Sequence, residues 1–184
     1  MPEVRPSEAM PLAAHSTGAG FADFFRLHKD RVAHIAARML GRDADVDDVV
    51  QDVFSTVLRR QAELPHMPSP ERWVVSLTVK RVLVLLRWRR VRARLGLYQQ
   101  VEMDQLVGTH TSAEGQLTVL RMYRALDQLP ASDRVAWLLR HVQGERLEDV
   151  ATLSGCSVAT AKRRITRAQA RLDEVFDEEG LRHE

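Results

Sequence analysis

The stretch that decides the fold covers residues 146–171 and reads RLEDVATLSGCSVATAKRRITRAQAR. Its first half carries apolar residues at helical spacing, and Gly155 then supplies a residue that tolerates a sharp turn. The second half turns Val158, Ala161 and Ile165 to one side and a row of Lys and Arg side chains to the other. A basic helix that follows such a turn is typical of a helix-turn-helix, whose second helix enters the major groove of DNA. The pattern therefore predicts DNA binding.

The composition favours helix and leaves room for one ordinary domain or two small ones in 184 residues. The formal net charge is only +2, so basic residues are clustered rather than spread over the molecule. A single cysteine, Cys156, excludes an intrachain disulfide, and we interpret it as a small buried side chain in the turn. The longest apolar run, residues 82–86, is too short to span a bilayer, and residues 1–20 lack the pattern of a signal peptide. These features predict a cytoplasmic protein.

The rest of the chain divides by composition into parts with different patterns. We expect a flexible tail at 1–20, a helical module at 21–94, a linker at 95–116 and a second helical module at 117–184. The linker assignment rests on a lack of Lys and Arg and on glycines that interrupt any long helix. The predicted fold class is all-α, with two small helical domains joined by a flexible linker.

Three helices are expected in the N-terminal module. The first follows a 3.6-residue apolar period and ends near Gly41, and Asp43 or Asp45 caps the second. A proline-punctuated loop follows. Ser69 then suits the N-cap of the third helix and Pro70 its first position.

The C-terminal module is expected to begin with two helices before the helix-turn-helix. The first starts at Leu117 and is stopped by Pro130. Ser132 or Asp133 can cap the next helix, which ends before Gly144.

Three segments, in this order and at this spacing, resemble conserved parts of one family. Residues 47–54 (DDVVQDVF) resemble a D-L-V-Q-E-V-F helix, and residues 73–87 resemble a W-L-x-x-I-A-x-N…D-L-L-R helix. The segment from Leu129 through the helix-turn-helix resembles the start of that family's domain 4. The chain thus resembles, over 21–92 and 117–175, a group IV (extracytoplasmic-function) sigma factor of bacterial RNA polymerase, in the sigma-70 family.

This resemblance implies a function and a set of partners. The two modules would be sigma domain 2, a three-helix module, and sigma domain 4, and they would engage the −10 and −35 elements of promoter DNA. The expected protein partners are core RNA polymerase, through its β′ clamp helices and β flap, and an anti-sigma factor of the kind that holds many relatives inactive. The chain would not itself be an enzyme, and no cofactor or metal is expected. Its seven histidines are scattered without ligand spacing.

An acidic face is predicted on the second helix. Asp48, Gln51 and Asp52 share one face because they stand at positions i, i+3 and i+4. By themselves they also fit an ordinary solvated face near a helix N-terminus. By resemblance they bind the β′ clamp helices of polymerase.

A basic cluster ends the third helix. The candidates for binding the −10 element or its phosphates are Lys80, Arg81, Arg87, Arg89 and Arg90. Phosphate binding accounts for the cluster economically because each neutralised phosphate releases counterions. The alternative is a solubilising helix end whose charges complement the helix dipole.

The second helix of the helix-turn-helix supplies the candidate −35 residues. They are Ser157, Thr160, Lys162, Arg163, Thr166 and Arg167. Arginine can pair with guanine through two hydrogen bonds, and lysine can donate to the same acceptors. Hydroxyl and backbone N–H groups at the helix N-terminus can bind phosphate.

Two positions depart from the family pattern and keep alternatives open. Lys80 stands where the family has Asn, and Val84 stands where it has Asp. These differences motivate a second hypothesis, a sigma-like, stand-alone DNA-binding regulator without initiation activity. A third hypothesis is a module whose helical faces mainly bind a regulatory protein.

Overall fold

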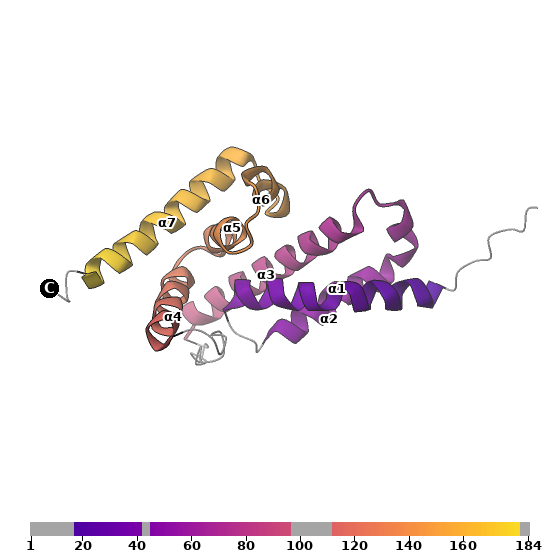
Figure 1. The fold of residues 1–184 in the computed structure, drawn as a ribbon, viewed down its shortest axis with the longest axis horizontal. Coiled ribbons are helices and arrows are strands. Elements are labelled where there is room, and N and C mark those ends of the chain that lie inside the picture. The colour runs from indigo at the N-terminus through magenta and orange to yellow at the C-terminus, as the bar shows by residue number, and fades with distance from the viewer. Residues whose placement is uncertain (1–16, 42–44, 97–111, 181–184) are drawn as a thin grey trace, which may run out of the picture.

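The computed structural model describes residues 17–41, 45–96 and 112–180, and its regular elements there are all helical (Figure 1). The N-terminal half contains α1 (Thr17–Leu40), α2 (Val46–Arg59), the short 3₁₀ helix η2 (Gln61–His66) and α3 (Pro70–Arg94). The C-terminal half contains α4 (Ala113–Gln128), α5 (Ala131–His141), α6 (Leu147–Leu153) and α7 (Val158–Gly180). The predicted all-α class is confirmed. No helix in these ranges combines the length and apolar composition that a membrane crossing requires.

The boundaries of the predicted segments can be compared only where the chain is described. Most of the expected tail, residues 1–16, and most of the expected linker, residues 97–111, lie outside the described residues. α1 begins at Thr17, inside the expected tail. α4 begins at Ala113, inside the expected linker, because Ser112 caps it by accepting a hydrogen bond from the Gly115 N–H at 3.2 Å.

The N-terminal module is a bundle of α1, α2 and α3. Its helices form because each carries a stripe of apolar side chains along one side. In α2, for example, Val46, Val49, Val53 and Val57 are buried at helical spacing, while the intervening polar residues face outward. Burial of such stripes against one another is the main favourable term that holds a bundle together.

The caps of this module follow the expected residues with one difference. Ser69 accepts a hydrogen bond from the Arg72 N–H at 3.4 Å, and Pro70 occupies the first turn of α3, as predicted. Asp45 holds the N-cap position of α2, but its carboxylate makes no capping hydrogen bond and instead pairs with Arg89. The other predicted cap, Asp43, lies outside the described residues.

The start of α5 corrects a prediction. Neither Ser132 nor Asp133 caps this helix, because Pro130 is its N-cap residue and α5 already begins at Ala131. The Pro130 carbonyl accepts hydrogen bonds from the N–H groups of Asp133 and Arg134, at 2.9 and 3.1 Å. Asp133 is therefore inside the first turn, and its side chain is free to contact another element.

The helix-turn-helix consists of α6, a turn at Gly155 and α7. Gly155 has a φ of +62°, a conformation that side-chain-bearing residues rarely adopt. Ala151 in α6 and Ala161 in α7 are both buried, so the two helices approach each other through small side chains. Cys156 is only partly buried in the turn.

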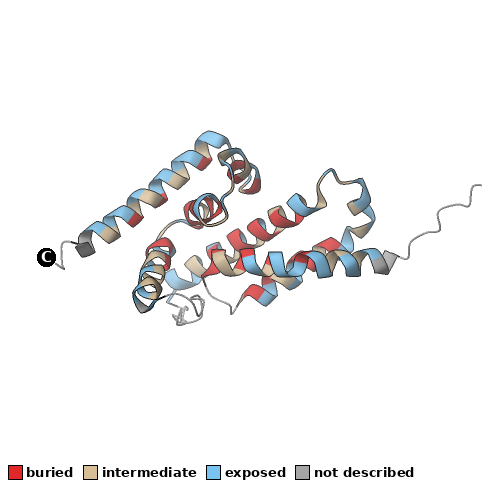
Figure 2. Ribbon diagram, in the orientation of Figure 1, coloured by how far each residue is buried: buried red, intermediate tan, exposed pale blue. Residues whose placement is uncertain are grey.

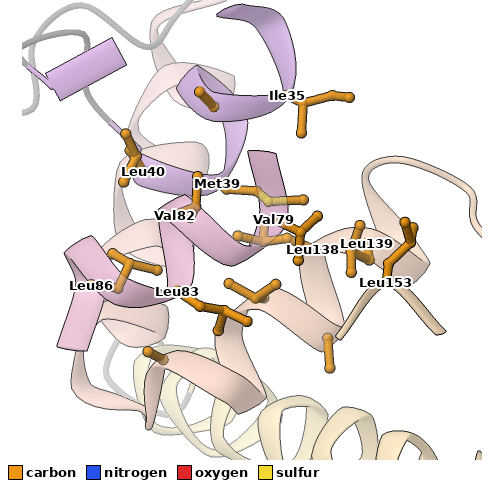
Figure 3. Close-up of a cluster of buried hydrophobic side chains, with 14 of the residues drawn as sticks. Ile35, Met39, Leu40, Val79, Val82, Leu83, Leu86, Leu138, Leu139 and Leu153 are labelled. Carbon is orange, nitrogen blue, oxygen red and sulfur yellow. The ribbon is translucent and has the colours of Figure 1, made fainter. Parts of the chain in front are cut away.

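The two modules pack against each other. α5 lies between the α1–α3 bundle and α7, and it contacts helices of both modules (Figure 1). Figure 2 shows buried positions along the facing sides of α3 and α5. Leu138 and Leu139 of α5 join Met39 of α1 and Val79 of α3 in a single apolar cluster (Figure 3).

Met39 tests this shared core. It is fully buried at the junction, so Met39→Ala should cost about 2–5 kcal/mol of unfolding free energy by leaving a cavity. The matched control is Leu27→Ala on the same helix, where the side chain is exposed and the change should stay within about 0.5 kcal/mol. Urea denaturation followed by circular dichroism measures both. Equal losses for the two variants would contradict the shared core.

Candidate functional site

The exposed face of α7 carries the predicted −35 residues. Ala161, Ala168 and Leu172 form the buried stripe of this helix. The side chains on the opposite face that are exposed to solvent are those of Lys162, Arg163, Thr166 and Arg167. α7 thus presents three cations and a hydroxyl on a helix that is packed on one side only, which is the arrangement needed to enter a DNA groove.

Hydroxyl groups organise the N-terminus of α7. The Ser157 Oγ accepts a hydrogen bond from the Thr160 N–H at 3.2 Å and donates to the Thr160 Oγ1 at 2.9 Å. Arg163 donates to the same Thr160 oxygen at 3.3 Å. The structure therefore brings these three predicted residues together, with Ser157 fixing the first turn of the helix.

Arg167 is held by a carboxylate from another helix. Its Nε lies 3.1 Å from the Asp133 Oδ2, and its Nη2 donates to the Asp133 Oδ1 at 3.4 Å. Asp133 is only 2 % exposed, whereas the Arg167 side chain is 68 % exposed. The ion pair therefore anchors one edge of the guanidinium and leaves its other edge facing solvent. The sequence pattern predicts Asp133 only as a helix cap. Its pairing with Arg167, 34 residues away, cannot be recognised from the neighbouring residues.

The predicted acidic face is present on α2. Asp48, Gln51 and Asp52 are all exposed. Asp52 is partly neutralised, because its Oδ2 lies 3.5 Å from the Arg81 Nη1 on α3. The sequence predicts Arg81 as a DNA contact. In the structure its side chain lies next to the acidic face of α2 and pairs with Asp52.

A groove of about 550 Å³ separates the exposed sides of α2 and α3. Its lining residues are Asp48, Val49, Gln51, Asp52, Arg81, Val84, Leu85, Trp88, Arg89 and Arg92. Trp88 is 61 % exposed and Val84 is 44 % exposed, so the α3 side of the groove combines apolar surface with its arginines. The groove itself has no local sequence pattern, because it forms only where two separate helices meet.

The remaining predicted residues on α3 differ in availability. Lys80 and Arg87 are exposed, and Arg90 is partly buried. Arg89 has a side chain only 12 % exposed, pairs with Asp45 and donates to the Leu40 carbonyl at 3.4 Å. In this conformation Arg89 stabilises the junction of α1, α2 and α3, and its charge is already balanced.

Acidic and cysteine or histidine side chains do not gather elsewhere in the described ranges. Among residues 17–41, 45–96 and 112–180, no three or more His, Cys, Asp or Glu side chains are placed to hold a metal ion. The two candidate surfaces are thus the α2–α3 groove and the exposed face of α7.

Comparison with protein families assigns both modules. Residues 24–92 match the model for Sigma-70 region 2, and residues 120–172 match the model for Sigma-70, region 4. Together the two matches span well over half of the chain. The groove and the α7 face lie within them.

Individual relatives are similar along most of the chain. The ECF RNA polymerase sigma factor SigM of Mycobacterium tuberculosis (strain H37Rv) is 31% identical over 169 residues, which cover 90% of this chain and 83% of SigM. The RNA polymerase sigma factor CnrH of Cupriavidus metallidurans is 26% identical over 187 residues, covering 95% and 97% of the two chains.

Solved structures share the fold. The sigma factor RpoE of Bartonella quintana, in a complex with the anti-sigma factor NepR, superposes with a TM-score of 0.62 at 24% identity, over 85% of this chain and 96% of RpoE. CnrH in complex with the cytosolic domain of CnrY superposes with a TM-score of 0.58 at 26% identity, over 88% and 93% of the two chains. The matches to both sigma-70 regions and the similarity to SigM show that this chain belongs to the extracytoplasmic-function sigma factors of the sigma-70 family, which direct RNA polymerase to promoters.

Proposed function

We propose that this sigma factor divides its work between its two modules, with boundaries at 21–94 and 117–184 and a tether at 95–116. The N-terminal module docks on core polymerase and engages the −10 element, and the C-terminal module reads the −35 element. The observation that carries the proposal is the presence of two separate exposed surfaces, one on each module. One is the α2–α3 groove, which has Asp48 and Asp52 on its α2 side and apolar and arginine side chains on its α3 side, and the other is the basic face of α7.

Polymerase docking uses the groove between α2 and α3. Asp48, Gln51 and Asp52 offer carboxylates and an amide along one side, and Trp88 offers exposed apolar surface along the other. Such a groove fits a helix that carries both basic and apolar side chains, and the β′ clamp helices are the family's partner at this place. Tryptophan is enriched among the residues that contribute most of the binding energy at protein interfaces.

Engagement of the −10 element uses the exposed cations of α3. Lys80 and Arg87 are free to neutralise phosphates, and Arg90 is partly available. Arg81 lies between the polymerase-docking surface and the DNA-binding cations, because it pairs with Asp52 of the docking surface. We assign Arg89 a supporting role, since its guanidinium holds the ends of α1 and α2 together.

Recognition of the −35 element uses α7 in the major groove. Lys162, Arg163 and Arg167 can donate to guanine acceptors, and Thr166 can contact a base or a thymine methyl group. Ser157 and Thr160 place hydroxyl and N–H groups where a phosphate can approach the helix N-terminus. Asp133 orients Arg167 and so contributes to base selection without touching DNA.

The remaining parts of the proposal concern setting and partners. The protein acts in the cytoplasm, has no catalytic activity of its own, and contacts the β flap of polymerase through its C-terminal module. The two superposed relatives, RpoE and CnrH, were solved with NepR and with the cytosolic domain of CnrY. A protein of the anti-sigma type is accordingly the regulatory partner that we propose.

Asp52→Ala tests the docking surface. Losing this carboxylate should weaken core polymerase binding by about 1 kcal/mol or more, roughly a fivefold or larger rise in Kd. Fluorescence anisotropy with labelled chain measures the Kd. Asp30→Ala, which removes an exposed carboxylate from α1, is the control with the same change in charge and should bind normally. An unchanged Kd for Asp52→Ala would remove this residue from the interface.

Arg167→Ala tests base reading by α7. If Arg167 pairs with a base, the variant should lose about 1–3 kcal/mol on the preferred −35 sequence and discriminate less at one base position. Competition binding against a set of −35 duplexes measures this loss. Arg124→Ala on α4 removes an exposed arginine from the same module and serves as the control. Equal weakening on every duplex would instead assign Arg167 to phosphate.

Asp133→Asn separates positioning from contact. The amide keeps the shape of the side chain but removes the charge that holds the Arg167 guanidinium. We expect reduced discrimination at the same base position, with non-specific DNA affinity retained because no phosphate-binding cation is lost. If discrimination stays at the level of the unaltered chain, Asp133 has no positioning role.

A further inference from the structure

The first turn of α7 carries two exposed apolar side chains. Val158, the first residue of the helix, is 42 % exposed, and Ala159 beside it is exposed as well. The sequence pattern predicts Val158 on the inward side together with Ala161 and Ile165. In the structure Ala161 is fully buried and Ile165 is partly buried, whereas much of Val158 faces solvent. The leading end of the helix thus keeps apolar surface that the module does not bury.

These two residues lie where a helix-turn-helix reads bases. The N-terminal residues of a recognition helix contact base edges in the major groove. Exposed positions follow the outer side of α7 from this end onward (Figure 2). Lys162 and Arg163 come one turn after Val158 and Ala159, and all four are exposed. With α7 in the groove, the apolar pair therefore enters ahead of the cations.

The polar side chains of the same turn are bonded to one another. The Ser157 Oγ accepts a hydrogen bond from the Thr160 N–H at 3.2 Å and donates to the Thr160 Oγ1 at 2.9 Å. Arg163 donates to that Thr160 oxygen at 3.3 Å. The Ser157 hydroxyl therefore fixes the start of the helix instead of reading a base. What the leading turn offers to a base edge is mainly the methyl groups of Val158 and Ala159.

Methyl groups at this place favour one base over the others. Thymine presents its C5 methyl in the major groove, whereas guanine, adenine and cytosine present hydrogen-bonding groups there. Contact between that methyl and the Val158 side chain removes apolar surface of both from water, which favours binding. A guanine or cytosine under the same turn would lose hydrogen bonds to water without gaining any from these two side chains.

We infer that Val158, with Ala159 beside it, reads a thymine methyl at the end of the −35 element that the first turn of α7 enters. This reading rests on the proposed role of α7 at the −35 element and adds a base preference to it. Thymine is selected under the first turn, and guanine under the cations that follow. Thr166 stands eight residues further on, about 12 Å along the helix, so a methyl in contact with Val158 is out of its reach.

Deoxyuridine in place of thymine tests the contact, because it lacks only the C5 methyl. The probe is the holoenzyme of core polymerase and the full-length chain, on a promoter whose chain-dependent start is mapped and whose −35 element has been located by base substitution. Each thymine on either strand of that element is replaced in turn, and competition binding gives the Kd of every duplex. The scan is repeated with Val158→Ala and with Leu117→Ala, which removes an exposed apolar side chain from α4 of the same module.

The expected result is a loss at one position that depends on Val158. One deoxyuridine should raise the Kd of the unaltered holoenzyme about fourfold, the effect of removing one methyl group from an apolar contact. With Val158→Ala the same replacement should change the Kd less than about twofold, because most of its apolar partner is gone. Leu117→Ala should keep the fourfold loss. At that position 5-methylcytosine should bind better than cytosine, since it restores the methyl group on another base.

Two results would overturn the thymine contact. One is a −35 element in which no deoxyuridine weakens binding, and the other is a loss that Val158→Ala leaves at its full size. Val158→Ala should keep the circular dichroism of the unaltered chain, because the side chain is exposed and Ala favours helix. The scan with the unaltered chain tests the methyl contact independently of that variant.

Failure of the proposed function gives a different pattern. If α7 does not read the −35 element, scrambling that element leaves the Kd of the unaltered holoenzyme unchanged, and the thymine contact is lost together with the proposed function. A rise in Kd on scrambling without any rise on methyl removal contradicts the thymine contact alone.

Discussion

The C-terminus of α1 is the point on which the arrangement of the helices depends. Its last carbonyls receive hydrogen bonds from Tyr123 of α4, Arg134 of α5 and Arg89 of α3. Three helices from both halves of the chain therefore satisfy one helix end, and the absence of a side chain at Gly41 leaves room for Tyr123 and Arg134. Because buried polar groups without partners are costly, these side chains and the α1 terminus hold one another in place.

This constraint links the fold to function. Tyr123 and Arg134 come from the module that would read the −35 element, and α1 comes from the module that would dock on polymerase. The contacts at the α1 terminus therefore join the two halves of the chain into one core.

Local sequence predicted the features that depend on local chemistry. Ser69 and Pro70 mark the start of α3, and Gly155 marks the turn of the helix-turn-helix, because caps and turns require particular residues at particular places. The all-α class follows from the apolar periodicity. The sigma factor family, inferred from three short segments, is confirmed by the matches to both sigma-70 regions.

Features that join distant parts of the chain could not be predicted in the same way. In the sequence, Arg134 is recognisable only as part of a family motif. Its burial depends on a hydrogen bond to the Met39 carbonyl, 95 residues away. The local pattern at Asp133 predicts only a helix cap, because its partner on α7 lies 34 residues further on. The groove beside Asp52 cannot be predicted without knowing how α2 and α3 are placed relative to each other. The pairing of Arg89 with Asp45 depends on the same placement, so the sequence alone predicts Arg89 as an available cation.

The measurement that bears most directly on the central claim is run-off transcription with core polymerase, with and without this chain, on a pool of promoter fragments whose start sites are mapped. If each module reads one element, starts should appear only with the chain and should be preceded by two separate preferred elements. A single preferred element, or no start that depends on the chain, would contradict the division of promoter recognition between the two modules.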